Sequence, residues 1–385
     1  MRIGQFFRSW RLGVLAVVLT GLALGAGAGR AGDDDRDEQG EWGAVFTLTN
    51  DPGGNELAVF ERDGRGRLAN PVFFPTGGKG TGTGLGNQGA LALGDDSQYL
   101  YAVNPGSNTI TVFQLGRRGP RAVQVVNSGG TRPISLTVRE DLLYVLNAGG
   151  GTPGGADSIA GFEIGDHGQL RPLRNSVALL SAANTGPAQI GFNSDGDVLI
   201  VTEKGTNTID LFAVNEKGLP AGRKSVASNG KTPFGFAFTR DDLLIVSEAF
   251  GGAANASAVS SYDLDADAGL LKVISPSVPT TETAACWIAI ISNGEYAYTT
   301  NTGSSTVTGY KIGGSGKLAI LNANGVAATT GAAPTDVVNL GNRGLFVLNS
   351  GDGTVGSYAI GQVGALTATQ TVGGLPTRAT GLVVR

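Results

Sequence analysis

The stretch LIVTEKGTNTIDLFAV, residues 199–214, has a near-copy about a hundred residues upstream, LYAVNPGSNTITVFQL, residues 100–115. Each copy has two short runs of β-branched, aliphatic and aromatic residues joined by a turn that contains glycine. This pattern predicts a β-hairpin. The second run of each copy carries an aliphatic residue followed three places later by an aromatic one, Ile209 with Phe212 and Ile110 with Phe113. That pair serves as a marker in a search for further repeats.

The marker pair occurs seven times along the chain, and its aromatic residues are spaced 53, 49, 50, 50, 48 and 48 residues apart. The pairs are Leu57/Phe60, Ile110/Phe113, Ile159/Phe162, Ile209/Phe212, Val259/Tyr262, Val307/Tyr310 and Val355/Tyr358. A second apolar run precedes each pair, a further run precedes that one in six repeats, and a more polar run follows each aromatic residue. Four short strands repeated at this interval are typical of a propeller blade. The sequence therefore predicts an all-β, seven-bladed β-propeller.

The last residues supply the strand that the first repeat lacks. Residues 29–43 contain no run of the innermost type, whereas ATGLVVR, residues 379–385, is an orphan copy of one. We therefore expect Leu382 to Val384 to lie next to Val45 to Thr49 and to close the ring in blade 1. Closure removes the unpaired edge strands of an open array.

The first residues resemble an export signal. Arg2, Arg8 and Arg11 form a positive region, an apolar stretch covers residues 12–24, and small residues follow at 26–28. We expect residues 1–28 to be a signal peptide, residues 29–43 an acidic linker, and residues 44–385 one propeller domain. The protein is then exported to the periplasm or the extracellular space. A retained anchor is the alternative, although the stretch is shorter than the roughly 20 residues of a membrane-spanning helix.

Composition limits the partners of the protein. Removal of residues 1–28, which contain three arginines and no acidic residue, changes the net charge from −4 to −7, and an acidic chain is not expected to bind nucleic acid. No membrane contact is expected beyond the signal peptide. The single cysteine, Cys286, lies among apolar residues and is interpreted as an inert buried thiol. No cluster of His and Cys predicts a metal, so we expect no cofactor and no metal. A monomer is expected.

The runs YAVN, YVLN, YTTN and FVLN, each followed by a turn that contains glycine, resemble YVTN-type propeller repeats. The whole array is similar to the lactonase-like family of seven-bladed propellers, which includes 6-phosphogluconolactonases and 3-carboxymuconate cyclases. The resemblance covers nearly all of the chain after the leader. It implies lactone chemistry in which an acidic or basic residue acts beside arginines that bind an anionic substrate. A histidine is implicated in some relatives, but His167 stands in a predicted hairpin turn at the rim.

The residue that ends the second strand forms a ring in the alignment of the repeats. It is Asn in five repeats (Asn50, Asn104, Asn147, Asn301 and Asn349) and Glu in two adjacent ones (Glu203 and Glu248). The asparagines are explained as turn-formers that bond their own backbone. Two carboxylates at one channel mouth would raise a pKa and give an acid/base pair, so Glu203 and Glu248 are the predicted catalytic residues. The alternative is that Glu203 pairs with Lys204 and Glu248 is solvated.

The loops that lead into the innermost strands carry cations at similar places. Arg132, Lys231 and Arg378 precede three of these strands, and a guanidinium can clamp a carboxylate or a phosphate. Gln189, Trp287 and Asp336 occupy the third positions of their strands and are predicted to face the channel. These six residues are the predicted ligand-binding set, with an inter-blade packing role as the alternative for Trp287. The glycine-rich stretch 77–86 is interpreted as a flexible entry loop into blade 2.

Two functions remain open from the sequence. The first is an exported hydrolase or binder of a small anionic lactone or sugar acid at the channel mouth. The second is a non-catalytic secreted propeller that recognises a protein or a glycan through its loop-rich face. Two long glycine-rich turns, residues 147–158 and 248–258, favour the second function because such loops adapt to a partner.

Overall fold

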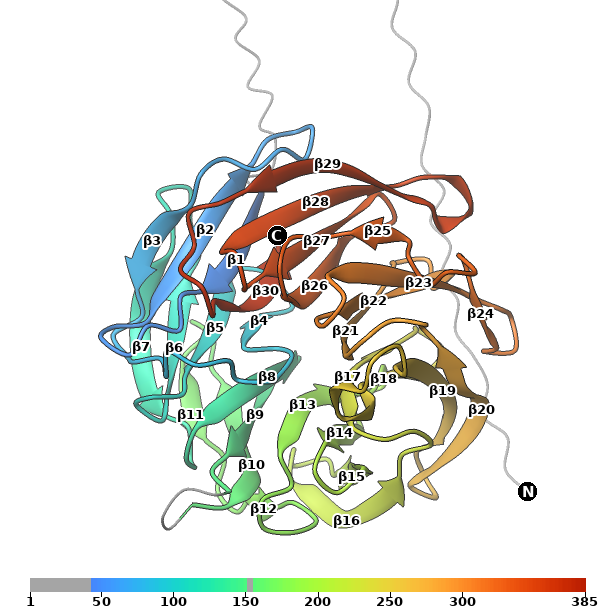
Figure 1. The fold of residues 1–385 in the computed structure, drawn as a ribbon. Coiled ribbons are helices and arrows are strands. Elements are labelled where there is room, and N and C mark those ends of the chain that lie inside the picture. Colours follow the sequence, from blue (N-terminus) through green and yellow to red (C-terminus); the bar gives the residue numbers. More distant parts are fainter. Residues whose placement is uncertain (1–42, 151–154) are drawn as a thin grey trace, which may run out of the picture. The chain divides into compact units, whose positions relative to one another are not determined.

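The computed structural model describes residues 43–150 and 155–385, and within them the strands form seven antiparallel sheets arranged around one axis (Figure 1). Five sheets have four strands from the axis to the rim, and in the other two the outermost place is divided between two short strands. The fold is the predicted seven-bladed β-propeller. The predicted signal peptide and all of the predicted linker except Gly43 lie outside the described residues, as do residues 151–154 of one long turn.

The strands are named here by their place in blades 1 to 7. The innermost strands are β30 (Thr380–Val384), β4 (Leu91–Leu93), β8 (Pro133–Arg139), β13 (Pro187–Phe192), β17 (Pro233–Phe238), β21 (Ala285–Ile290) and β26 (Pro334–Leu340). The second strands are β1 (Gly43–Leu48), β5 (Tyr99–Asn104), β9 (Leu142–Ala148), β14 (Val198–Glu203), β18 (Leu243–Glu248), β22 (Tyr296–Asn301) and β27 (Gly344–Asn349).

The outer half of each blade is more polar. The third strands are β2 (Glu56–Arg62), β6 (Thr109–Gln114), β10 (Asp157–Ile164), β15 (Thr208–Val214), β19 (Ala258–Asp265), β23 (Thr306–Ile312) and β28 (Thr354–Ile360). The outermost strands are β3 (Val72–Pro75), β7 (Arg121–Asn127), β11 (Leu170–Pro172) with β12 (Ala178–Leu179), β16 (Pro220–Ala227), β20 (Leu270–Pro279), β24 (Leu318–Ile320) with β25 (Ala328–Thr329), and β29 (Leu366–Val372). Two short 3₁₀ helices, η1 (Phe250–Gly252) and η2 (Gln362–Gly364), lie in turns.

The core lies between neighbouring blades. The second strands are buried along nearly their whole length because each sheet is covered on both faces. The marker aromatic of the third strand is also buried in every repeat, with at most 5% of its surface exposed. The aliphatic–aromatic pair therefore records inter-blade packing, which explains why it repeats through the whole array.

Tyrosines of the second strand tie blades 2, 3 and 6 to the blade that follows each of them. The hydroxyl of Tyr101 donates to the carbonyl of Gly168, that of Tyr144 to Gly218, and that of Tyr298 to Gly364. Each acceptor belongs to the turn between the third and fourth strands of the following blade. The tyrosine of the YVTN-type run is thus a connector between blades.

The C-terminal strand closes the ring in blade 1, as predicted. Strand β30 pairs with β1 in antiparallel register, with Val384 opposite Val45 and Val383 opposite Phe46. Two further main-chain hydrogen bonds join Ala44 and Arg385, at 3.2 and 2.9 Å. Strands from the two ends of the described chain therefore share one sheet.

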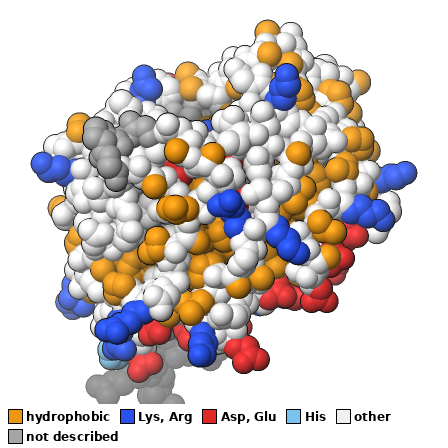
Figure 2. Space-filling model, turned by 90° about the horizontal axis from the view of Figure 1, so that it is seen from below, with side chains coloured by type: hydrophobic (Ala, Val, Ile, Leu, Met, Phe, Trp, Pro, Cys, Tyr) orange, Lys and Arg blue, Asp and Glu red, His pale blue; other side chains and the backbone are white. Residues whose placement is uncertain are grey.

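The rim leaves the outermost strands exposed. Figure 2 views the side that lies at the bottom of Figure 1, where hydrophobic side chains are scattered among charged ones. Among the exposed residues are Val177 and Leu179 of blade 3, with 58% and 60% of their surfaces accessible. Within the described part of the chain, no helix has the length and apolar character needed to cross a membrane.

Candidate functional site

The entrance to six of the seven innermost strands is a residue in a left-handed conformation. The residues at this place have φ between 47° and 76°: Arg132, Gly186, Thr232, Ala284, Ala333 and Arg378. In five of these blades the carbonyl of this residue accepts a main-chain amide from the same blade. The donor is the residue after the ring position: Ala148, Lys204, Ala249, Thr302 or Ser350. We call this end of the central channel, where both sets of residues lie, the channel mouth.

A segment of the glycine-rich entry loop lies across the axis at the mouth. Asn87 is 2% exposed. Its side-chain amide donates to the carbonyl of Ile134 in blade 3 and accepts from the hydroxyl of Thr380 in blade 1 at 3.2 Å. The indole N–H of Trp287 in blade 6 donates to its main-chain carbonyl at 2.5 Å. A residue that contacts three well-separated innermost strands must lie on the axis, so we call residues 84–88 the plug.

Gln88 extends the plug to the far side of the ring. Its amide N–H donates to the carbonyl of Ala188 in blade 4 at 3.1 Å. Its side chain makes two bonds with the main chain of Ile288 in blade 6, at 2.9 and 3.1 Å. A Cβ at Gly235 would lie 2.2 Å from the Gln88 Oε1 atom. The glycine of blade 5 therefore leaves the space that the plug occupies.

Two cations lie beside the plug at the mouth, and a third, Arg132, stands at the entrance of β8, in which the Ile134 carbonyl accepts from the plug. A Cβ built on Gly84 lies 3.8 Å from Nη1 of Arg378, and one built on Gly86 lies 3.3 Å from Nζ of Lys204. The Nζ atom of Lys204 donates to the carbonyls of Gly86 and Pro187 and lies 4.7 Å above the ring of Phe234. Arg132 is near enough for its charge to act on Lys204.

Lys204 has the perturbed acidity of a functional group. Burial lowers its pKa to about 8, and the charge of Arg132 acts in the same direction. An amine with this pKa exists partly in its neutral, proton-accepting form near neutral pH. The Nε atom of Arg132 is buried and has no hydrogen-bond partner among the described residues. The channel mouth therefore has positive charge and, at Arg132 Nε, a hydrogen-bond donor without a partner among the described residues.

The third residues of the innermost strands mostly join neighbouring blades. Gln189 makes two bonds with the main chain of Phe236 in the next blade, at 3.0 and 2.7 Å. Trp287 contacts the plug and packs against Phe234 with 5.0 Å between the ring centres. Asp336 is buried and accepts the amides of Val337 and Leu382, while burial raises its pKa well above its usual range. Their roles in ligand binding stay predictions.

Glu203 lies inside blade 4 and is fully buried. It accepts the amide of Ser181 at 2.9 Å, the hydroxyl of Ser181, and the hydroxyl of Thr206 at 2.5 Å. Ser181 belongs to the connection from blade 3, so the carboxylate fastens that connection. Lys204 directs its Nζ atom to carbonyls instead of to Glu203.

Glu248 has the equivalent position in blade 5. It accepts the amide of Gly230 at 2.8 Å and the hydroxyls of Ser260 and Ser277 at 2.5 and 2.6 Å. Burial raises its pKa. The alternative of a solvated Glu248 is wrong, because the side chain is buried. The donors that each glutamate accepts lie in its own blade or in the connection that leads into it, and the catalytic role predicted for the two stays a prediction.

Three of the five ring asparagines, Asn104, Asn301 and Asn349, bond threonines of the third strand, whereas Asn50 bonds the entry loop and Asn147 bonds the carbonyl of Ser128. The side-chain amide of Asn104 donates to the hydroxyls of Thr109 and Thr111, and that of Asn301 donates to Thr306 and Thr308. In blade 4 the register brings Thr208 and Asp210 to these places. The asparagine amide donates to these threonine hydroxyls. A glutamate carboxylate can only accept, and each of the two accepts an amide of the connection that leads into its blade.

Among the described residues, no hydrogen bond joins the remaining candidates to the plug. Lys231 is exposed, and its main-chain carbonyl accepts the amide of Phe250. His167 is exposed in the turn between β10 and β11, as predicted. Cys286 is buried, and burial raises its pKa to about 12, which agrees with an inert thiol. No group of three His, Cys, Asp or Glu residues in the described part of the chain is arranged to hold a metal ion.

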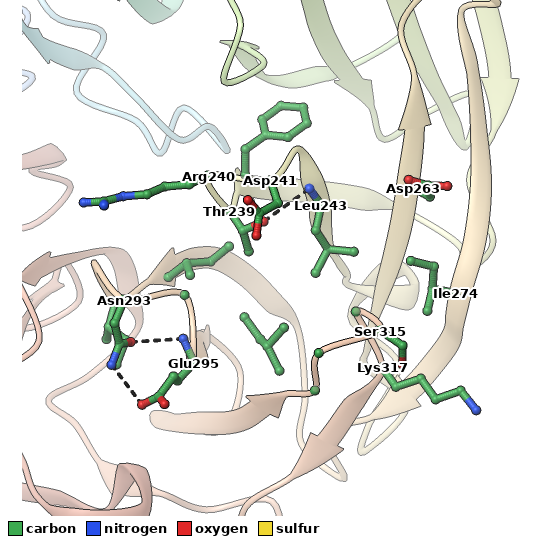
Figure 3. Close-up of a pocket in the computed structure, with 18 of the residues that line it drawn as sticks. Thr239, Arg240, Asp241, Leu243, Asp263, Ile274, Asn293, Glu295, Ser315 and Lys317 are labelled. Atoms are coloured by element: carbon green, nitrogen blue, oxygen red, sulfur yellow. Dashed lines mark hydrogen bonds between the residues drawn. The ribbon is translucent and has the colours of Figure 1, made fainter.

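A large groove lies far from the mouth, at the opposite ends of blades 5 and 6 (Figure 3). It encloses about 1200 Å³ and has an aliphatic floor that includes Leu243 and Ile274. Its charged lining residues are three cations and three acids: Arg240, Lys272, Lys317, Asp241, Asp263 and Glu295. Figure 3 shows Arg240 and Lys317 extended away from each other, so they do not converge on one ligand group. The charge and the perturbed pKa identify the mouth as the better candidate.

The sequence contained a signal for Lys204 that the prediction did not use. The residue after the ring position is small in four other repeats, namely Ala148, Ala249, Thr302 and Ser350. Lys204 is therefore a departure of the same kind as Glu203. The plug residues Asn87 and Gln88 gave no such signal, because their partners lie in blades far along the chain.

Comparison with known proteins places the chain in a family. The model of the family described as lactonase, 7-bladed beta-propeller, matches residues 54–179 and 155–286. No curated protein sequence matches the chain. A putative 6-phosphogluconolactonase from Bacteroides fragilis is similar in structure, with a TM-score of 0.70 at 18% identity over 90% of this chain and 99% of the other. The periplasmic gluconolactonase PpgL of Pseudomonas aeruginosa has a TM-score of 0.70 at 16% identity, over 89% and 98%.

Proposed function

Because the chain belongs to the seven-bladed β-propeller lactonase family, we propose that it is an exported hydrolase that opens a small anionic lactone at the channel mouth. The observation that carries this proposal is the gathering of Arg132, Lys204 and Arg378 at the mouth. Because the plug crosses the axis, a ligand bound there enters from the mouth. Export is supported by the leader pattern and by the periplasmic location stated for the Pseudomonas protein.

The cations have separate roles in this proposal. Arg132 and Arg378 bind the carboxylate or phosphate of a sugar-acid lactone, as guanidinium groups do with planar or tetrahedral oxyanions. Lys204 in its neutral form takes a proton from water, and the resulting hydroxide adds to the lactone carbonyl. The C–O bond of the ring then breaks, and the lysine ammonium returns the proton to the ring oxygen, which gives a hydroxy acid.

The sequence prediction offers a different acid/base pair, Glu203 and Glu248. Their hydrogen bonds support a structural role, since every donor that they accept belongs to their own blade or to the connection leading into it. Lys204 is favoured because it lies at the mouth. The two assignments predict different mutants to be inactive.

Hydrolysis of a panel of lactones, followed as acid release in a pH-stat, tests the proposal. The panel pairs each anionic lactone, carboxylated or phosphorylated, with a neutral one of the same ring. Arg378→Gln is expected to raise KM for the anionic lactone by about tenfold, the value of a charged hydrogen bond of about 1.4 kcal/mol, and to leave KM for the neutral one unchanged. Lys204→Met is expected to abolish turnover while binding persists.

The glutamate variants decide between the two acid/base assignments. Glu203→Gln and Glu248→Gln are expected to keep kcat once folding is verified by circular dichroism. Loss of kcat in a folded Glu variant, with activity in Lys204→Met, would transfer catalysis to the carboxylates. Binding of the anionic member without turnover of any lactone would instead identify a non-catalytic binding propeller, the second function predicted from the sequence.

A further inference from the structure

A second groove lies between blades 7 and 1, on the face opposite to the channel mouth. It encloses about 520 Å³. One wall is the turn from β2 to β3, which carries Arg62, Arg65 and Arg67, and the other wall is the turn from β26 to β27, which carries Arg343. Gln370 of β29 joins the walls through two bonds with the main chain of Leu68, at 2.8 and 2.9 Å. The groove is therefore built into the junction at which the ring closes.

The charge of this groove has one sign. The described residues that line it include four arginines and no Asp or Glu. Asp63 belongs to the same turn and accepts the amides of Arg65 and Arg67 at 2.9 and 2.8 Å. The larger groove between blades 5 and 6 carries equal numbers of cations and acids. The two grooves occupy equivalent places in the propeller, so the excess of arginine distinguishes the junction of blades 7 and 1 from that of blades 5 and 6.

Two polar groups in the groove have no partner among the described residues. Ser357 of β28 lines the groove, is only 4% exposed, and has a hydroxyl without a hydrogen bond. The Nε atom of Arg62 is also buried and unpartnered, although its Nη2 atom donates to the main-chain oxygen of Arg385 at 3.2 Å. A buried donor left unsatisfied costs about 1–3 kcal/mol, and such groups often mark the place of an ion or a ligand.

We propose that this groove is a second ligand site, which takes a sugar-sized molecule carrying a phosphate or sulfate ester. The tetrahedral oxyanion accepts hydrogen bonds from the arginines of both walls, and Ser357 Oγ and Arg62 Nε supply the inner donors. A volume of about 520 Å³ accommodates one or two sugar rings beside the ester. The site is independent of the mouth and of the hydrolytic function proposed for it.

Isothermal titration with glucose 6-phosphate, glucose 6-sulfate and glucose tests this site. The two esters are expected to bind and glucose is not, and the preferred ester identifies the source of the oxyanion. The double variant Arg67→Gln/Arg343→Gln is expected to weaken ester binding by at least about tenfold, since each charged hydrogen bond is worth about 1.5–3 kcal/mol. Arg118→Gln/Arg174→Gln is the matched control, because it removes two exposed arginines outside the groove.

Ser357→Ala separates binding from stability. Removal of an unpartnered hydroxyl is expected to leave the melting temperature unchanged or slightly raised, while ester affinity falls. Equal weakening by the groove variant and the control variant would overturn the proposal, because it would indicate general surface charge. Loss of ester binding only in Arg132→Gln/Arg378→Gln would also overturn it, since the ester would then bind at the channel mouth. Failure of both esters to bind the unaltered protein would do the same.

Discussion

Asp210 in blade 4 illustrates how a different residue type at one repeat position changes the chemistry around it. Two features raise its pKa to about 7: first its burial, then the nearby carboxylate of Glu203. Ser225 and Arg223 partly compensate, the latter at 3.7 Å. In blades 2 and 6, the corresponding places carry asparagine and threonine, which do not titrate. Blade 4 therefore contains a proton-dependent contact that these two blades lack.

This contact predicts a pH dependence of stability. Between pH about 4 and about 7 the folded Asp210 keeps a proton that the unfolded chain has lost, so the free energy of unfolding falls as pH rises through this window. Below the window both states are protonated, and above it both are charged, so the contribution is constant at each end. Asp210→Asn is expected to make the fall of the free energy of unfolding with pH less steep, by up to the slope that one bound proton contributes. Urea unfolding at several pH values measures this slope. A slope identical to that of the unaltered protein contradicts the assignment.

The sequence predicted the location of site residues better than their contacts. Arg132 and Arg378 were placed correctly at the entrances of innermost strands because the repeat register fixes that place in every blade. The partners of Glu203 were not predictable, since Ser181 lies in a connection whose path depends on the packing of two blades. Lys204 was within reach of the same alignment, as a long charged residue among small ones.

At the scale of elements, two glutamines that belong to different elements make the same pair of hydrogen bonds with the main chain of an innermost strand. Gln189 belongs to an innermost strand and bonds the main chain of the next blade at Phe236. In blade 5 the equivalent place is Gly235, and Gln88 of the plug makes the corresponding pair of bonds with Ile288. The glycine-rich stretch was correctly predicted as the entry to blade 2, but its packing across the axis was not, because no local pattern encodes contacts 200 residues apart.

Replacement of Gln88 tests the structural value of the plug. Gln88→Ala is expected to lower the free energy of unfolding by about 1–3 kcal/mol, because it leaves buried main-chain groups of Ile288 unpaired. Gln189→Ala is the matched variant and is expected to cost a similar amount. Chemical denaturation of both variants provides the comparison, and a neutral Gln88→Ala beside a destabilising Gln189→Ala would show that the plug is not fixed by these bonds.

The tyrosine connectors give a second test at this scale. Tyr298→Phe removes the donor to Gly364 in the following blade, 2.8 Å away, without changing the packed ring. A loss of about 1–2 kcal/mol is expected because a buried carbonyl is left unsatisfied. Tyr296→Phe is the control, since it alters a less buried tyrosine of the same strand. Equal stability of the two variants would refute the connector role.

For the whole molecule, the repeat count and the closing strand were both predicted, because each depends on a pattern that recurs along the entire chain. Strand β30 covers the edge of β1 and buries Leu382 against blade 7 and blade 1 residues. Function was predicted less well, because the blade motifs encode packing between blades. The charge of each groove depends instead on which residues its turns carry.

Deletion of residues 379–385 tests closure directly. The truncated protein is expected to lose cooperative unfolding and to associate, since β1 and the neighbouring edge of blade 7 then face solvent. Thermal denaturation followed by circular dichroism and size-exclusion chromatography measure the two effects. Addition of a synthetic peptide of residues 377–385 is expected to restore a cooperative transition, and a stable monomer without the peptide would contradict the role of β30.

The strand order also has a consequence for biosynthesis. Blade 1 takes its innermost strand from residues that the ribosome makes after every other blade, so translation of the propeller must finish before that sheet can form. Six blades can assemble while the nascent polypeptide grows, but blade 1 is completed only when β30 has been translated. Throughout elongation the chain therefore carries one incomplete sheet, and chaperones that recognise extended segments have a defined interval in which to hold it.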